Sequence, residues 1–253
     1  MAVQPVTNGP LPPGPLLTPT PSGKALPVAG LSLISLGVLT ILLLHVIPPS
    51  SHTNPMTRTI SEYALGANGW LFDLGVLALA TGSAAVAVTL IRARVLSAAG
   101  PATILIFGWT AALVVLVVFE KYNFSHGQRT GASGLIHRMA SLVAFLCLPA
   151  GAALAARRGR RDERWRRVAT WVRYSAWLSW ACLGLLLYAI GQGFVTDVSW
   201  WRVFPLGALE RLIALAEIVT LYALGVWSVR TAGSAVLPID PVGDGRGGAP
   251  LME

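Results

Sequence analysis

Six long apolar runs constrain this chain more than any other feature of its sequence. They cover approximately residues 29–47, 70–91, 102–119, 135–156, 171–190 and 206–227. Each run is close to the roughly 20 residues with which a helix crosses about 30 Å of hydrocarbon. A backbone surrounded by lipid must satisfy its hydrogen bonds within the segment, and these runs are too long for barrel strands. The runs therefore predict an all-α fold, a polytopic membrane bundle of six transmembrane helices.

The composition agrees with a membrane protein and argues against other classes. Of the 253 residues, 54% are hydrophobic and 12% are charged, and the mean hydropathy is +0.64. A net charge of +8 would suggest nucleic acid in a soluble protein. Here the basic residues cluster between the apolar runs, so we expect no nucleic-acid partner. Cys147 and Cys182 lie inside apolar runs and are interpreted as small hydrophobic residues, and the sequence predicts no resident metal or cofactor.

The two ends of the chain differ in composition from the apolar runs. Residues 1–28 are rich in Pro, Thr and Gly, and residues 231–253 are rich in Gly, Pro and Asp. Such segments bury too little apolar surface to fold, so we expect two disordered cytoplasmic tails flanking a transmembrane domain at residues 29–230. No small-residue cleavage site follows the first run, which favours a retained helix in a multi-pass protein of the cell (plasma) membrane.

The basic residues predict how the bundle lies in the membrane. Thirteen of the 19 Lys and Arg residues fall before the first run, in the linkers after the second and fourth runs, or after the sixth. Cytoplasmic loops carry an excess of basic residues, so both termini are predicted to be cytoplasmic and the loops after the first, third and fifth runs external. The arginine-rich linker after the fourth run could also bind lipid headgroups or nucleic acid, but its position favours a topology anchor.

Seven polar residues are candidates for a functional site. A charged side chain at bilayer depth costs about 2.5 to 3.5 kcal/mol, so one retained inside a span needs a partner or a purpose. The candidates, all in external loops or the predicted outer half of the bundle, are Glu62, Tyr63, Asp73, His137, Glu210, Arg211 and Glu217.

Glu217 is the deepest of these candidates. It shares a helix face with Glu210, seven residues earlier, and lies on the order of 15 Å below the outer boundary. A carboxylate there must be protonated, paired with a cation such as Arg138 or Arg211, or open to a water-filled cavity. Two structural alternatives remain open. Glu210 and Arg211 can form an interfacial ion pair, and Glu217 can be a neutral residue bonded to a neighbouring helix.

The stretch HTNPMTRTISEYALGANGWLFDLG, residues 52–75, predicts an external lid between the first two spans. Thr59 and Ser61 can cap a short surface helix that carries Glu62 and Tyr63. Folded over the outer mouth, this helix would bring Glu62 near the polar residues of the fourth and sixth spans. The alternative is a lid that only shields helix ends. His45, inside the first run, is interpreted as an interfacial hydrogen-bonding residue.

Metal binding is an alternative for the histidines. His126 and His137 are eleven residues apart, whereas metal ligands on one helix come three or four apart. A metal would therefore require both histidines to meet Asp73, Glu62 or Glu210 across helices.

Three different segments together carry a resemblance to a known family. They are ISEYALGANGWLFDLG after the first run, HGQRTGASGLIHRMA leading into the fourth, and GALERL at the start of the sixth. Together they resemble the DUF998 family of bacterial and archaeal membrane proteins, whose biochemical function is not established. The resemblance covers roughly residues 29–230. The matching positions are Ser61, Glu62, Tyr63, Gly66, Gly69, Trp70, His137, Glu210 and Arg211.

These residues support three functional hypotheses. The first is a binder or transporter of a lipid or small polar solute, with an outward-facing polar site inside the membrane. The second is a metal-assisted membrane lipid hydrolase, with Glu62 or Asp73 as general base and His137 as a metal ligand. The third is a non-catalytic membrane scaffold. Membrane lipids are the expected partners, and the first two hypotheses require Asp73, His137 and Glu210 to converge beneath the lid.

Overall fold

A computed structural model of the chain describes residues 21–119, 131–195 and 204–233, and these residues form helices and turns without a strand. Six helices in these ranges are long and apolar enough to cross a membrane, which confirms the predicted all-α bundle. They are α1 (Ala25–Leu44), α2 (Gly69–Arg92), α3 (Pro101–Val118), α4 (Ala132–Gly159), α5 (Arg166–Val195) and α7 (Leu206–Ala232).

The helices extend beyond several of the predicted apolar runs. A short 3-10 helix, Pro21–Lys24, leads directly into α1, so residues 21–28 are helical and not part of a disordered tail. Pro27 does not prevent this early start, because the first turn of a helix has no intrahelical partner for its N–H groups. Residues 1–20 and 234–253 of the predicted tails lie outside the described residues, as does His126.

Helices α1 and α2 pack through four glycines. They run antiparallel, with Gly30 against Gly82 and Gly37 against Gly75. A methyl group on Gly37 would lie 2.6 Å from the carbonyl oxygen of Gly75, and one on Gly82 would lie 2.6 Å from that of Gly30. Small residues let membrane helices approach closely, and here the two backbones touch.

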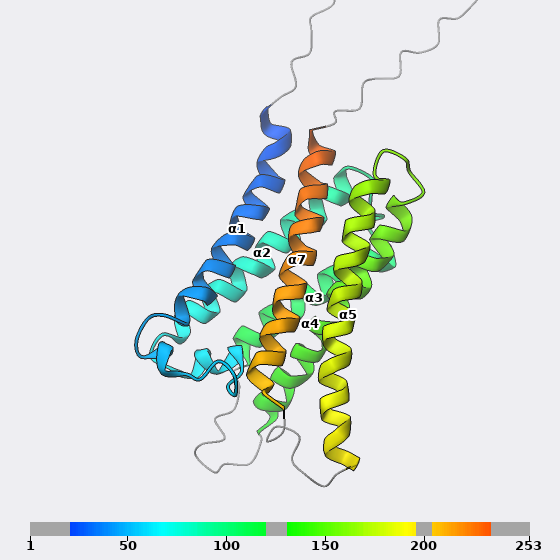
Figure 1. Cartoon of the computed structure of the whole chain (residues 1–253). Helices are drawn as coiled ribbons and strands as arrows, with labels where there is room; N and C mark the ends of the chain where they lie inside the picture. The colour runs from blue at the N-terminus through cyan, green and yellow to red at the C-terminus, as the bar shows by residue number, and fades with distance from the viewer. Residues whose placement is uncertain (1–20, 120–130, 196–203, 234–253) are drawn as a thin grey trace, which may run out of the picture.

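Helix α7 lies between α1 and α5 in the view of Figure 1. It packs against α1, α2, α4 and α5. Near its end, the indole of Trp227 is fully buried against Gly159 of α4. A helix with so many neighbours can carry polar side chains without exposing them to lipid, and this position governs the environment of Glu210, Arg211 and Glu217.

The two ends of the bundle differ. At one end, called the terminal end, α1 begins and α7 finishes (Figure 1). At the opposite end, called the loop end, residues 45–68 connect α1 to α2 through two short 3-10 helices, η2 (Ser50–His52) and η3 (Ile60–Leu65). The external lid predicted from the sequence belongs to the loop end.

Candidate functional site

The short helix η3 carries two of the predicted site residues and is capped by one of them. Thr59 precedes the helix in an extended conformation, as an N-cap residue does. The Glu62 carboxylate reaches back to the Thr59 N–H at 3.5 Å and accepts from the Thr59 hydroxyl at 3.3 Å. Its other oxygen lies 3.3 Å from the Arg58 guanidinium. Glu62 is therefore engaged in fixing the local fold of the lid.

Arg211, one turn into α7, fastens the lid to the last helix. Its Nη1 donates to the carbonyl oxygens of Pro55 at 2.9 Å, Arg58 at 2.7 Å and Gly207 at 3.0 Å. The planar guanidinium presents five N–H donors in a fixed fork, which suits a convergence of carbonyl groups from separate turns. The charge of Arg211 is thus used to gather loop backbone at the loop end of the bundle.

The remaining donors of Arg211 reach an aromatic pair. Its Nε donates to Nε2 of His45 at 3.0 Å, and its Nη2 donates to the Tyr63 hydroxyl at 3.4 Å. Since an arginine can only donate, His45 Nε2 must accept, and Nδ1 must carry the ring proton that it donates to the Ile41 carbonyl at 2.9 Å. The rings of His45 and Tyr63 meet edge to face with centroids 5.0 Å apart.

Glu210 makes a second connection between α7 and the lid. Its Oε2 accepts from the backbone N–H of Ile60, the first residue of η3, at 2.9 Å. A carboxylate at a helix start satisfies an N–H that has no partner within the helix. We call His45, Arg58, Glu62, Tyr63, Glu210 and Arg211 together the loop-end cluster.

Gly207 makes the close approach of lid and helix possible. A methyl group at this position would collide with the carbonyl groups of Pro55 and Arg58. The neighbouring Ala208 N–H donates to the Met56 carbonyl at 3.1 Å. The lid therefore lies directly on the first turn of α7.

Glu217 lies apart from the loop-end cluster, in the interior of the bundle. It is eleven residues from Leu206, so its Cα is about 16 Å along the helix from that end. The side chain is only 5% exposed. One carboxyl oxygen lies 3.5 Å from the indole Nε1 of Trp109 in α3. The other oxygen has no hydrogen-bond partner among the residues that the structure describes.

Asp73 and His137 occupy other helices toward the loop end. Asp73 is half-buried, one turn into α2. His137 of α4 is 2% exposed, and its Nδ1 lies 2.8 Å from the carbonyl oxygen of Phe119, which follows α3. The imidazole thereby links the end of α3 to the start of α4. The predicted convergence of Asp73, His137 and Glu210 stays a prediction.

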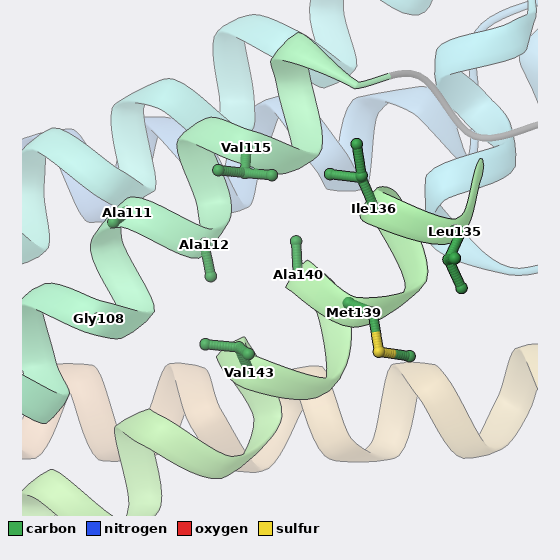
Figure 2. A pocket seen from close by; sticks show the side chains of 9 residues that line it. All are labelled: Gly108, Ala111, Ala112, Val115, Leu135, Ile136, Met139, Ala140 and Val143. Atoms are coloured by element: carbon green, nitrogen blue, oxygen red, sulfur yellow. The ribbon is translucent and has the colours of Figure 1, made fainter. Parts of the chain in front are cut away.

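A groove lies between α3 and α4 (Figure 2). Its volume is about 470 Å³, and Ala112 and Ala140 contribute small side chains to its floor. Gly108 also lines it, next to Trp109, whose indole points into the bundle toward Glu217. All the lining residues are apolar, and none of the seven predicted site residues is among them.

The metal-assisted hydrolase hypothesis requires a ligand set. Within residues 21–119, 131–195 and 204–233, no three His, Cys, Asp or Glu side chains lie together as a metal site. The described part of the chain therefore supplies no geometry from which to derive a metal-dependent step.

Residues 28–227 match the family model described as "Protein of unknown function (DUF998)". This range takes in well over half of the chain and contains most of all six helices. The chain belongs to the DUF998 family. The resemblance predicted from the sequence is confirmed, whereas comparisons with curated proteins and with solved structures gave no match.

The DUF998 region contains the loop-end cluster, Trp109 and Glu217. Four contributors to the site are not among the seven predicted residues: His45, Arg58, Trp109 and Gly207. The signal for Trp109 is its place in the middle of an apolar run, away from the interfacial belts where an indole N–H finds water. The contact of His45 with Arg211 and that of Gly207 with Pro55 and Arg58 each join residues more than 100 positions apart.

Proposed function

We propose that this DUF998 protein binds a lipid or small polar solute inside the membrane, with the Glu217 carboxyl as the polar contact. The observation that carries the proposal is the oxygen of Glu217 that the described residues leave without a donor. Ionisable residues retained at bilayer depth usually mark a ligand or ion pathway. A hydroxyl or amine of a bound molecule would supply the missing hydrogen bond.

The contrast with the loop-end cluster supports this choice of residue. Arg211, Glu210 and Glu62 are all engaged by the protein itself. A ligand at the loop-end cluster would first have to displace those contacts. Glu217 keeps a carboxyl oxygen that no described residue uses, so Glu217 is the better candidate for recognition. In this proposal the cell membrane is the site of action and a lipid is the first class of ligand to test.

A scaffold is the second candidate function, and the Arg211 network favours it. Four hydrogen bonds from one guanidinium hold residues 45–68 against α7, a fifth goes to the Gly207 carbonyl within α7, and no outside group is needed to complete them. In a scaffold the polar residues would serve only to fix the bundle, and Glu217 would be a packing residue.

Native mass spectrometry of the detergent-extracted protein separates the two candidates. Binding predicts a co-purified molecule on the wild-type protein that is lost in Glu217→Gln, which keeps the size of the side chain but removes its acidity. Glu62→Gln is the matched control, because that carboxylate is engaged at η3, and it should retain the molecule. If Glu217→Gln keeps every adduct and melts at a higher temperature than wild type, Glu217 is a packing residue and the scaffold is favoured.

A further inference from the structure

We propose that a groove between α1 and α7 holds one acyl chain of an anionic phospholipid, with Lys24 binding its phosphate. This site is separate from Glu217 and lies toward the terminal end of the bundle. It rests on the shape of the groove, the placement of one basic side chain and the length of the helix stripe between them.

The groove runs along one face of α1. Its lining includes Val28, Ser32, Leu36 and Leu39 of α1, together with Val229 of α7, and its volume is about 580 Å³. These α1 residues recur at intervals of three or four, the spacing of one helix stripe. The groove therefore lies along the helices, in the direction that a lipid chain takes in a bilayer.

Small side chains leave this space open. Ser32 is exposed on the groove, and Ser35 shares a 2.8 Å hydrogen bond with the Tyr222 hydroxyl of α7. Farther along, Gly225 of α7 lets the side chain of Leu31 approach the helix backbone. A larger residue at position 32 would fill the groove between the two helices.

Lys24 stands at the end of the same stripe. It is exposed, four residues before Val28, and its backbone is helical, so it continues the α1 face that lines the groove. A methyl group on Gly233 would lie 3.2 Å from Lys24 Nζ, which places the ammonium over the end of α7. Lys24 and Gly233 each lie about one helical turn beyond the last groove residues, Val28 and Val229, so the ammonium lies just past this end of the groove.

The length of the stripe fits one lipid leaflet. From Val28 to Leu39 is eleven residues, or about 16 Å of helix, against about 15 Å for half of a bilayer's hydrocarbon core. An acyl chain in the groove would place its headgroup beside Lys24. Charge complementarity then selects an anionic phospholipid over a zwitterionic one, and basic sites between helices on the cytoplasmic side are known to bind such headgroups.

The test uses the full-length protein in detergent with added dioleoyl phosphatidylglycerol or dioleoyl phosphatidylcholine, followed by native mass spectrometry. Wild type should retain the anionic lipid more strongly. Lys24→Gln should weaken retention of phosphatidylglycerol about fivefold, because one basic group near the surface contributes about 1 kcal/mol, and should leave phosphatidylcholine unchanged. Ser32→Trp should reduce retention of both lipids by filling the groove.

Two control variants sharpen the result. Arg92→Gln removes an exposed charge from the same end of the bundle, at the last residue of α2, and should retain phosphatidylglycerol like wild type. Glu217→Gln should also retain it, which keeps this proposal independent of the proposed function. Equal retention of the two lipids by wild type, equal losses in Lys24→Gln and Arg92→Gln, or undiminished binding in Ser32→Trp would each overturn the proposed site.

Discussion

At the scale of single residues, Arg211 does work that another cation cannot take over. Its contacts spread from Nε through Nη1 to Nη2. They reach two carbonyls of the lid, one carbonyl of α7, and the side chains of His45 and Tyr63. A lysine ammonium is a point charge on a flexible stem and cannot present this fork. The charge alone is therefore not what holds the lid.

Replacement of Arg211 by Lys should destabilise the protein although the charge is kept. We expect a loss of about 2 kcal/mol, because several charge-assisted hydrogen bonds are lost and water replaces them only in part. Equilibrium unfolding by SDS in mixed micelles measures the change. Arg58→Lys is the control, since the Arg58 side chain in the 3.3 Å pair with Glu62 is 56% exposed and surface pairs contribute less than about 1 kcal/mol. Equal effects of the two substitutions would contradict the role given to the Arg211 fork.

Gly207 offers a second residue-scale prediction. Gly207→Ala should destabilise by about 1 to 3 kcal/mol, because the new methyl group meets the carbonyls of Pro55 and Arg58 and the lid must shift. The matched control is Gly184→Ala in α5, which is exposed and has open space around it. This control should be neutral or stabilising by up to about 1 kcal/mol. A neutral Gly207→Ala would show that the lid does not lie on α7 as described.

At the scale of the helices, the sequence predicts where each helix lies along the chain better than it predicts which residues of two helices touch. All six apolar runs coincide with helices, because the length of an apolar run is set by bilayer thickness. Periodicity could not reveal the pairing of Gly30 with Gly82 or Gly37 with Gly75, since glycines in an apolar run look alike until a neighbour is known. The helix ends also shift, because charged and small residues continue a helix past the hydrocarbon, as α5 does from Arg166.

The glycine contact between α1 and α2 should be sensitive to one added methyl group. Gly37→Ala places it against the Gly75 carbonyl and forces the helices apart, with an expected loss of about 1 to 3 kcal/mol. Gly37→Ala and Gly75→Ala modify the same contact, so their effects should not add. A double-mutant cycle followed by SDS unfolding measures this coupling, and strictly additive effects would argue against direct packing at this pair.

At the scale of the whole molecule, the distribution of basic residues predicts cytoplasmic termini. In a background of Cys147→Ser and Cys182→Ser, a membrane-impermeant maleimide should label His52→Cys in intact cells, because η2 belongs to the predicted external loop. Ser97→Cys, in the turn between α2 and α3, should be labelled only after the cells are permeabilised. The reverse pattern would invert the bundle and place Lys24 on the external side.

The candidate site was only partly predictable, because its contacts join residues that are far apart in the sequence. Glu217 can be recognised from the sequence, because a carboxyl group inside an apolar run is energetically costly and therefore unusual. Its partner Trp109 is hydrophobic enough to be taken for lipid-facing surface, and a contact between residues 108 positions apart leaves no local pattern in the sequence. Likewise, Glu210 and Arg211 are conspicuous in the sequence, but the carbonyl and N–H groups that they bind are backbone atoms, which every residue has.

The attachment of the lid to α7 has a consequence for the order in which the protein is completed during synthesis. Residues 45–68 leave the ribosome long before Leu206, yet Arg211, Glu210 and Gly207 supply their anchoring contacts. Helices α1 and α2 can pack through their glycines as soon as α2 has been synthesised. Their connecting loop can form its contacts with α7 only after the last helix has been made. The last span is thus required to complete the first loop, and a chain that ends before α7 would lack the residues that anchor residues 45–68.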